Sequence, residues 1–249
     1  MSLSAVIISH NAAGRLGECL TSVSFCDEII VVDSGSTDDT VNLARRAGAK
    51  VIQQAWLGFG PQKQFAVQQA SSDWILCLDT DESVSKHLQT SIVAALRSPN
   101  ARVFAVARCN RFLGRWLRHG EGYPDWSVRL FHRAAAQWSA DAVHEKIITR
   151  EPVERLSGDL LHNSAETLEN YLNKQNRYTT LQAQHLFEQG CRSAPIQMVL
   201  SPLARFFKFY FVRLGFLDGL PGLIHVCIGC MNSFTKYAKA IELQKAASQ

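Results

Sequence analysis

The chain has 249 residues, with a hydrophobic fraction of 47%, a charged fraction of 19% and a formal net charge of +4. This length can bury the core of one large domain, or of one domain with an appendage. The net charge is too small to indicate nucleic-acid binding, and the basic residues are not interleaved with a recognisable reading motif.

The cysteines and the N-terminal residues predict a cytoplasmic protein. The seven cysteines are odd in number, scattered and mostly in apolar contexts, which is typical of reduced side chains rather than of a disulfide framework. The sequence begins without the basic segment of a signal peptide and enters a strand at once. No apolar run reaches the roughly 18 residues that a membrane span requires.

The first eighty residues alternate between predicted strands and predicted helices. Short apolar runs rich in β-branched residues predict strands that are buried on both faces. The predicted strands are 3–9, 28–32, 50–53 and 74–78, and the helices between them are 15–23, a segment capped by Ser36 or Thr37 that ends near Gly48, and 62–70. This alternation predicts a parallel, doubly wound sheet.

The second half is less regular. A helix at 85–96 and a strand at 103–107 are followed by a long loop at 108–124, which is rich in Gly, Arg and aromatic residues. Short strands are expected at 128–132 and 146–149. From Ser164 onward the spacing is helical, and after Pro195 and Pro202 we expect a helical tail that runs to about Leu243.

Polar side chains directly follow three of the predicted strands. His10 and Asn11 follow the first strand, Asp33 follows the second, and Asp79 and Asp81 follow the fourth. Ligands of doubly wound sheets bind at the carboxyl ends of the strands, so these residues mark a candidate site. Two carboxylates so close together require neutralisation, and a divalent metal held by oxygen ligands would supply it and would also hold phosphates.

Asp33 allows two interpretations. Its carboxylate can accept a hydrogen bond from a ribose hydroxyl or a base N–H group, with Gly35 permitting the tight turn that follows. Alternatively, the segment 34–39 only caps the next helix, with Asp38 and Asp39 in the first turn of that helix.

Several motifs together resemble those of the family 2 glycosyltransferases. They are SHN (9–11), VVDSGSTDDT (31–40), GFGPQKQFAVQQASSDWILCLDTDES (58–83), PDWSVRLFHR (124–133), VHEKI (143–147), LHNS (161–164) and RFFKFYFVRLGFLDGLPGL (205–223). The resemblance covers nearly the whole chain and is strongest to the bacterial lipopolysaccharide-core β-1,4-glucosyltransferases. One departure is Ala12, where relatives commonly carry glutamate after the His-Asn pair.

The resemblance implies an α/β protein with the GT-A fold, in which a mostly parallel, Rossmann-like central sheet is flanked by helices and followed by a C-terminal helical extension. It implies a catalytic domain at 1–163, with a nucleotide-sugar half at 1–100 and an acceptor half at 101–163. The remaining residues, 164–249, would form a helical, membrane-associating region. The implied activity is that of an inverting, metal-dependent hexosyltransferase. It would move glucose from UDP-glucose to an inner-core heptose of lipopolysaccharide or lipooligosaccharide, at the inner face of the inner membrane.

The resemblance also implies roles for individual residues. Asp33 would hold the base or ribose, while Asp79 and Asp81 would bind the ribose and the metal-pyrophosphate. Asp81 would ligate the Mg²⁺ or Mn²⁺ ion directly, and His144 or His162 would complete the metal shell. The implied donor-binding residues are Ser9, His10, Asn11, Asp33, Lys63, Asp79, Asp81 and Arg129.

Some of these side chains have simpler alternatives. Lys63 can be a solvent-facing helix residue, Arg129 can form a structural ion pair, and a lone histidine is more often structural than a ligand. Direct displacement at the sugar C1 also requires a base for the proton of the acceptor hydroxyl. The candidates are Glu82, Glu121, Asp125, Asp141 and Glu145. Glu145 is favoured because it lies in a family-like segment, and Asp125 is the second choice.

The C-terminal tail suggests a partner. Its aromatic residues between Phe206 and Phe216 alternate with Arg205, Lys208 and Arg213, which is typical of an interfacial helix that meets anionic lipid. A core helix or a dimer contact would explain the same pattern. The predicted partners are therefore a UDP-sugar, a lipid-anchored saccharide acceptor and the membrane surface, without nucleic acid.

Two other functions stay open at this point. One is transfer of a sugar to a polyprenyl phosphate, and the other is a catalytically silent protein that binds sugar nucleotides. The sequence does not choose among glucose, galactose and N-acetylglucosamine, nor does it identify the metal or the oligomeric state.

Overall fold

The computed structural model describes residues 1–140, 145–164, 167–191 and 193–247. The chain divides into two compact units. The sheet unit consists of Met1–Arg108 and Asp125–Asn163, and the helical unit consists of Cys109–Pro124 and Ser164–Gln249. Nearly all of the segment predicted as a loop at 108–124 therefore belongs to the helical unit, together with the C-terminal helices.

The first half of the sheet unit has the predicted alternation of strands and helices. Its four strands lie in the order β3-β2-β1-β4 and all pair in parallel. The strands are β1 (Leu3–Ser9), β2 (Glu28–Asp33), β3 (Lys50–Gln53) and β4 (Trp74–Asp79), and the connecting helices are α1 (Ala13–Ser22), α2 (Thr40–Arg46) and α3 (Phe59–Gln68). Parallel strands place their carboxyl ends at one edge, which is where the candidate site lies.

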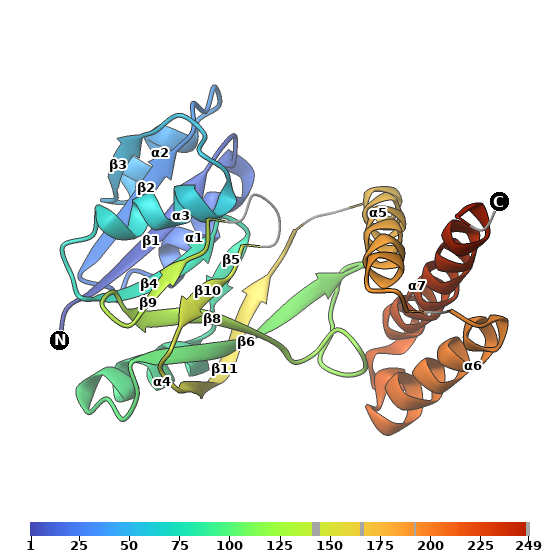
Figure 1. Cartoon of the computed structure of the whole chain (residues 1–249). Helices are drawn as coiled ribbons and strands as arrows, with labels where there is room; N and C mark the ends of the chain where they lie inside the picture. Colours follow the sequence, from blue (N-terminus) through green and yellow to red (C-terminus); the bar gives the residue numbers. More distant parts are fainter. Residues whose placement is uncertain (141–144, 165–166, 192, 248–249) are drawn as a thin grey trace. The chain divides into compact units, whose positions relative to one another are not determined.

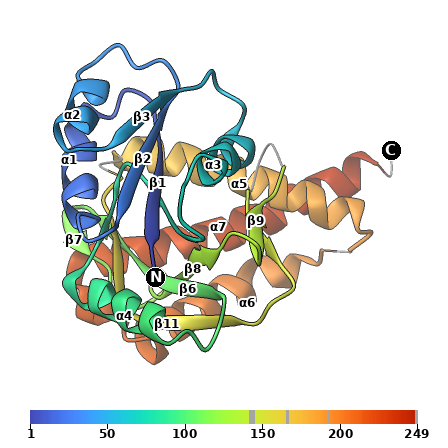
Figure 2. The same cartoon turned by 90° about the vertical axis from the view of Figure 1, so that its left-hand side faces the viewer.

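The strands are apolar on both faces because helices cover both faces. On one face, Ile7 belongs to a core that includes Leu16 of α1 and Ile92 of α4 (Lys86–Arg97). On the other face, Val6 packs in a core with Ala66 of α3. Figure 2 shows α1 and α2 on one side of β1, β2 and β3, and α3 on the other.

The second half of the sheet is antiparallel. β8 (Asp125–His132) pairs with β4 and with β6 (Val103–Phe112), and β11 (Val153–His162) pairs with β5 (Glu82–Val84). A separate two-stranded sheet consists of β9 (Ala136–Trp138) and β10 (Ile147–Thr149) (Figure 1). The predicted α/β class with a helix-flanked sheet is confirmed, and the sheet combines a parallel half with an antiparallel half.

Several local predictions were wrong. β11 was not predicted because its sequence, VERLSGDLLH, lacks a β-branched run and its first three residues are exposed. β9 was also missed. The strand predicted at 103–107 continues to Phe112, where the loop was expected, and turns back through Leu113 and Gly114, which both have positive φ, into β7 (Arg115–Trp116).

The second helix begins later than predicted. Asp38 and Asp39 precede α2 instead of lying in its first turn. The Asp38 carboxylate accepts hydrogen bonds from the backbone N–H groups of Ala13 (3.1 Å) and Thr40 (3.0 Å). The side chain is therefore used to tie the start of α1 to the start of α2.

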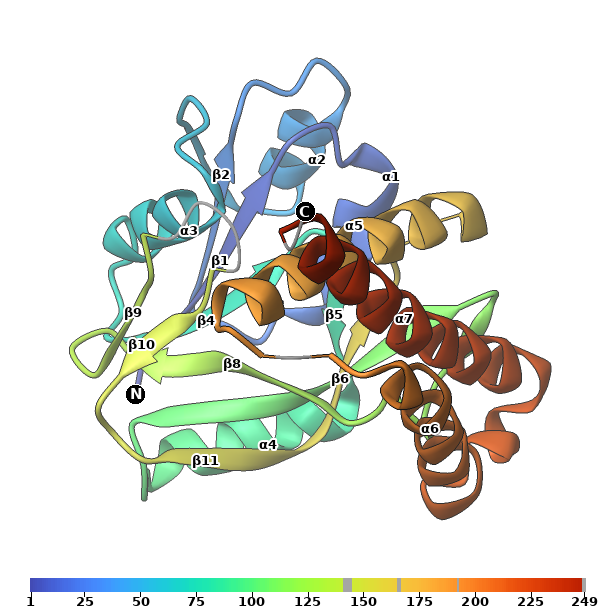
Figure 3. The same cartoon turned by 45° about the vertical axis from the view of Figure 1, so that its right-hand side comes forward.

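The helical unit contains α5 (Leu168–Glu188), α6 (Pro195–Phe206) and α7 (Gly219–Ala246), with α7 packed against both of the others (Figure 3). The predicted helical tail is not continuous. A π-helical segment (Phe207–Val212) and a 3₁₀ turn (Gly215–Asp218) separate α6 from α7, and Leu214 between them has a φ of 56°. The helical segments before and after this break, Pro195–Val212 and Gly215–Ala246, differ in direction by 72°.

Within the described part of the chain, no single helix combines the length and apolar character that crossing a membrane requires. The bent pair of segments on either side of Leu214 meets that requirement only when the two are taken together.

Candidate functional site

Asp33 lies at the end of β2, directly opposite Ser9 at the end of β1. Its carboxylate is fully buried and accepts hydrogen bonds from the Ser9 hydroxyl (3.1 Å) and from the backbone N–H groups of Gly35 (3.0 Å) and Ser36 (2.8 Å). These bonds hold the 34–36 turn in a tight shape. The Asp33 carboxylate therefore lies buried at the strand-end edge and is already hydrogen-bonded within the protein.

The loop after β1 is tied to the loop after β2. Asn11 has a φ of 45°, a conformation that asparagine tolerates, and its amide oxygen accepts the backbone N–H of Thr37 at 2.8 Å. In return, the backbone N–H of Asn11 donates to the Ser36 hydroxyl at 2.8 Å. The adjacent His10 is exposed. Hydrogen bonds therefore join the loops that follow these two strands.

Asp79, at the end of β4, is held by two cations. One carboxylate oxygen lies 2.9 Å from the Lys63 Nζ atom, and the other accepts a hydrogen bond of 3.0 Å from the Arg129 guanidinium. Burial works to raise the pKa of the Asp79 carboxyl, but the charges of Arg129 and Lys63 outweigh it and hold that pKa well below its usual range. Asp79 is therefore an ionised carboxylate whose negative charge is already balanced by Lys63 and Arg129.

Lys63 reaches Asp79 from the buried face of α3, so it is not a solvent-facing helix residue. A Cβ atom at Gly60 would lie 2.1 Å from the carbonyl oxygen of Ser139, and only glycine permits α3 to approach this closely. The Lys63 ammonium lies 4.7 Å from the ring centroid of Trp138, within the range of a cation–π contact. Gly60 thus allows the close packing of α3 that places Lys63, one turn later, beside Asp79.

Arg129 bridges Asp79 to a second acid. Its guanidinium, which is 4% exposed, also donates to Glu82 at 2.6 Å, and the other Glu82 oxygen accepts the backbone N–H of Asp79 at 3.0 Å. Burial raises the pKa of the Glu82 carboxyl above its usual value, although Arg129 opposes this. The Nε atom of Arg129 is buried and has no hydrogen-bond partner in the described structure. Arg129 therefore takes part in a structural ion pair, and its Nε–H group can still donate a hydrogen bond.

The two candidate bases lie at opposite ends of this charged network. Glu145 accepts from the Lys63 ammonium at 3.2 Å, and Asp125 accepts two hydrogen bonds from Arg108, at 2.6 and 2.9 Å. The alternating network runs Asp125, Arg108, Glu82, Arg129, Asp79, Lys63, Glu145. The other candidates are less suited: the Glu82 side chain is fully buried, Glu121 belongs to the helical unit, and Asp141 lies outside the described residues.

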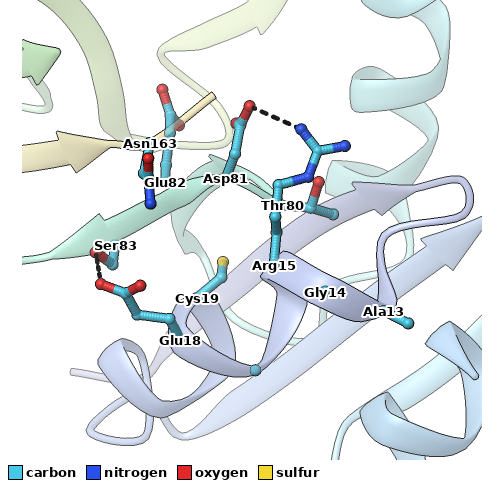
Figure 4. Close-up of a pocket in the computed structure, with 11 residues that line it drawn as sticks. Ala13, Gly14, Arg15, Glu18, Cys19, Thr80, Asp81, Glu82, Ser83 and Asn163 are labelled. Carbon is cyan, nitrogen blue, oxygen red and sulfur yellow. Dashed lines mark hydrogen bonds and ion pairs between the residues drawn. The ribbon is translucent and has the colours of Figure 1, made fainter. Parts of the chain in front are cut away.

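Asp81 differs from Asp79 because its partners are weaker. One carboxylate oxygen lies 3.7 Å from Arg15 and 3.5 Å from the Nε2 atom of His162. Burial works to raise the pKa of Asp81, but His162 outweighs it and the pKa is lowered. Asp81 and Arg15 both line a pocket of about 160 Å³, together with the rest of the segment 80–83, the first turns of α1 and Asn163. Figure 4 shows the two side chains pointing toward one another.

These residues fit a divalent cation with few protein ligands. Among the described residues, no group of three or more His, Cys, Asp and Glu side chains is arranged to hold a metal. Mg²⁺ commonly takes only one or two carboxylates and completes its shell with phosphate oxygens and water. Neighbouring corners of an octahedral shell lie about 3 Å apart, so Asp81 and His162 at 3.5 Å are compatible with two adjacent ligands. His144, the other histidine predicted to ligate the metal, lies outside the described residues.

The structure adds three residues that the sequence did not single out for the site, namely Arg15, Arg108 and Trp138. Glu82, which directly follows Asp79-Thr80-Asp81 (the DTD motif), was predicted only as a candidate base, and the structure shows it as the partner of Arg129. Trp138 had no signal in the sequence, because the strand that carries it was not predicted.

The sequence of the chain is similar to those of known proteins. Residues 4–156 match the model of the family described as Glycosyl transferase family 2. An uncharacterized glycosyltransferase of Rickettsia felis (strain ATCC VR-1525 / URRWXCal2) is 31% identical over 256 residues, covering 96% of this chain and 89% of that protein. The lipopolysaccharide core biosynthesis glycosyltransferase LpsC of Rhizobium meliloti (strain 1021) is 32% identical over 247 residues, covering 96% and 92%.

A similar fold is present among solved structures. The crystal structure of S. aureus TarS 1-349 aligns with a TM-score of 0.51, covering 99% of this chain and 92% of that chain. The same protein in complex with UDP gives the same values. The sequence identity is 14%, so this likeness concerns the fold alone.

Replacing Arg129 with methionine tests the central ion pair. The variant leaves the fully buried Glu82 and the partly buried Asp79 without the guanidinium, and we expect the free energy of unfolding at pH 7.5 to fall by about 3–5 kcal/mol. Without Arg129, burial raises the folded-state pKa of these carboxyls above the unfolded value, so the folded variant binds more protons. Its loss of stability relative to the wild type should therefore be smaller at pH 5.5 than at pH 7.5. Urea unfolding at both pH values measures this.

Arg133→Met is the matched control. Arg133 donates to the backbone carbonyls of Val67 (3.1 Å) and Ala70 (2.8 Å), and it pairs with no carboxylate among the residues that the structure describes. Its loss should cost stability equally at both pH values. An equal pH response of the two variants would contradict the electrostatic role of Arg129.

Proposed function

We propose that this chain, which belongs to glycosyltransferase family 2, transfers a hexose from a UDP-sugar to a lipopolysaccharide or lipooligosaccharide core saccharide, with inversion at the sugar C1. The observation that carries the proposal is that the two carboxylates of the DTD motif, Asp79 and Asp81, have different surroundings. Asp79 is neutralised by two buried cations, whereas Asp81 faces a pocket with weak partners. The relative LpsC supports a core saccharide as acceptor and the family resemblance supports glucose as the sugar and a heptose as its acceptor residue.

In this proposal the donor diphosphate lies near Asp81 and Arg15, while the nucleoside lies over the strand ends at Asn11 and Asp33. Asp81 and His162 would hold Mg²⁺ or Mn²⁺. Such an ion would neutralise the charge that develops on the departing diphosphate. The buried cations Lys63 and Arg129 would keep Asp79 from repelling the diphosphate.

Asp81→Asn tests the donor site. At a donor concentration of about 100 times Kd, binding should raise the melting temperature of the wild type by about 5–10 °C. We expect this shift with one UDP-sugar only when Mn²⁺ or Mg²⁺ is present, and we expect Asp81→Asn to lose both the shift and sugar transfer. The measurement is a thermal-shift screen of UDP-glucose, UDP-galactose and UDP-N-acetylglucosamine with and without metal.

The control is Asp39→Asn, because Asp39 is an exposed carboxylate paired with Arg46 at 2.6 Å. It should behave as the wild type. A metal-dependent shift that survives in Asp81→Asn would refute the assignment of Asp81. A donor-dependent shift without any transfer would favour the silent nucleotide-sugar binding protein.

We assign the general base to Glu145. In the reaction, the acceptor oxygen attacks C1, the bond from C1 to the diphosphate oxygen breaks with its electron pair leaving on the diphosphate, and the acceptor proton passes to the base. Glu145 is 23% exposed and joins the Asp79 centre through a single lysine. Asp125 is the second candidate, but Arg108 engages it through two hydrogen bonds.

Glu145→Gln and Asp125→Asn form a matched pair of neutral, nearly isosteric variants. We expect Glu145→Gln to lower kcat by a factor of about 10²–10⁴, because proton transfer to a positioned base contributes that much. The Asp125→Asn variant should keep kcat within about tenfold. Steady-state kinetics with a radiolabelled donor measures both. The reverse ranking would move the base to Asp125.

The helical unit has a surface that suits binding to a membrane, which supports transfer to a lipid-anchored acceptor. A stripe of large apolar residues along α6 and the π-helical segment is between 50% and 63% exposed, namely Ile196, Val199, Leu200, Leu203, Phe207 and Phe211. Their spacing places them on one side of the helix. Residues 195–217 include Arg205, Lys208 and Arg213 and no acid. An apolar stripe with cationic neighbours matches an anionic lipid surface, where a lipid-anchored acceptor would lie.

The double variant Leu203→Glu/Phe207→Glu tests this stripe. Each substitution forfeits the burial of a large apolar side chain, worth about 1.5–3 kcal/mol, so binding to phosphatidylglycerol vesicles should weaken at least about tenfold. Leu181→Glu/Phe187→Glu on α5 is the control, because both residues are 38% exposed and lie off the stripe. Vesicle co-sedimentation measures the binding.

Two results would oppose membrane docking. One is equal vesicle binding by the two double variants. The other is a concentration-dependent dimer that only the stripe variant loses, which would assign the stripe to a second copy of the chain. A polyprenyl phosphate acceptor remains the alternative substrate, and assays with both acceptors and one donor separate the two.

A further inference from the structure

The contact between α5 and α7 contains a polar pair beside an apolar cluster. In the cluster, Tyr171 and Leu172 of α5 pack against a group that includes Ile228 of α7, while Thr179 and Ala183 are the buried residues of α5. Asn232 of α7 donates to Gln175 of α5 at 2.8 Å. Such a hydrogen bond mainly offsets the cost of burying its own polar groups, so it adds little net stability. A binding role would explain why these polar side chains are present.

A pocket of about 110 Å³ opens beside this contact. Tyr171 and Tyr178 of α5, and His225, Asn232 and Lys236 of α7, contribute to its lining. All of its lining residues belong to the helical unit, so the pocket is separate from the strand-end site of the sheet unit.

The lining of the pocket includes an ion pair between Arg205 and Glu121. Arg205 donates through Nε to a Glu121 oxygen at 2.9 Å and through Nη2 to the other oxygen. Gly229 makes room for this pair, because a Cβ atom there would lie 2.3 Å from a Glu121 oxygen and 3.0 Å from the Arg205 Nε atom. The arginine and the carboxylate are therefore fixed in orientation, as in sites that recognise hydroxyl groups.

The remaining charge in the pocket is positive. Glu121 balances Arg205, and burial, followed by the charge of Arg205, lowers the pKa of His225 to about 4, so this imidazole is neutral at pH 7. Lys236 contacts the ring of Tyr237 at 4.3 Å, and no carboxylate or hydrogen-bond acceptor among the described residues pairs with its ammonium. An uncompensated cation in a polar pocket is suited to an anion.

We propose that this pocket binds a sugar that carries a phosphate or carboxylate group. Lys236 contacts the anionic group, the tyrosine side chains and the Asn232 amide contact the sugar ring and its hydroxyls, and the Arg205–Glu121 pair forms part of the wall. The volume accommodates the anionic group and part of the ring, with the rest of the saccharide outside. The identification of this sugar as part of the acceptor rests on the proposed function, whereas the binding itself does not.

The test is direct binding to the full chain by NMR, read at the side-chain amide signals of Asn232 and Gln175. The probes are glucose 6-phosphate, glucuronate, glucose and inorganic phosphate, all in the presence of saturating UDP to occupy the strand-end site. We expect glucose 6-phosphate or glucuronate to shift these signals at concentrations at least about tenfold below those needed for glucose or phosphate. The stronger of the two identifies the anionic group.

Lys236→Met should weaken that binding at least about tenfold, whereas Lys174→Met, which removes an exposed lysine from α5, should leave it unchanged. Asn232→Ala provides a second pocket variant if Lys236→Met does not fold. Equal affinities in the lysine variants would overturn the proposal. So would signals that no probe shifts, which would mean that the pocket holds only water, or equal binding of inorganic phosphate and the charged sugars. The experiment uses no sugar transfer, so its failure is distinguishable from failure of the proposed function.

Discussion

The buried bridge from Arg129 to Asp79 and Glu82 is the interaction on which the candidate site depends. β4 carries Asp79 and belongs to the parallel half of the sheet, while β8 carries Arg129 and begins the antiparallel half. The bridge therefore joins the two halves at the edge where the strands end. Removing the Arg129 guanidinium would leave the fully buried Glu82 without its nearest cation and Asp79 with Lys63 alone, which costs far more than the bridge contributes. This constraint explains how two acids three residues apart can share one place at the end of β4.

The same bridge separates the roles of the two DTD carboxylates. Lys63 and Arg129 neutralise the charge of Asp79. We therefore infer that Asp79 mainly holds the other residues of the site in position. Asp81 has only longer contacts to Arg15 and His162, and it faces the pocket. A cation that binds there meets a carboxylate whose charge is still available. The network of ion pairs also extends to both candidate bases, Glu145 and Asp125.

The helical unit reverses the usual distribution of polarity in a packed group of helices. Its outer stripe along α6 is apolar and exposed, whereas the contact between α5 and α7 includes a polar pair and lies beside a polar pocket. Either feature alone would be costly in water, since exposed apolar stripes promote association and buried polar groups lose hydration. A lipid surface outside and a charged sugar inside would relieve both costs. The two proposals for this unit therefore rest on independent observations.

The sequence by itself determined the parallel strands, the strand-end position of Asp33, Asp79 and Asp81, and the family, because apolar runs and motifs are local patterns. The tertiary structure alone decided which charges meet. Lys63 and Arg129 come from a helix and a strand that are distant in sequence, and Trp138 lies on a strand with no local signal. The polar β11 was likewise invisible, because its place at the sheet depends on partners rather than on its own residues. Pairing energies depend on distances in space, which sequence spacing does not contain.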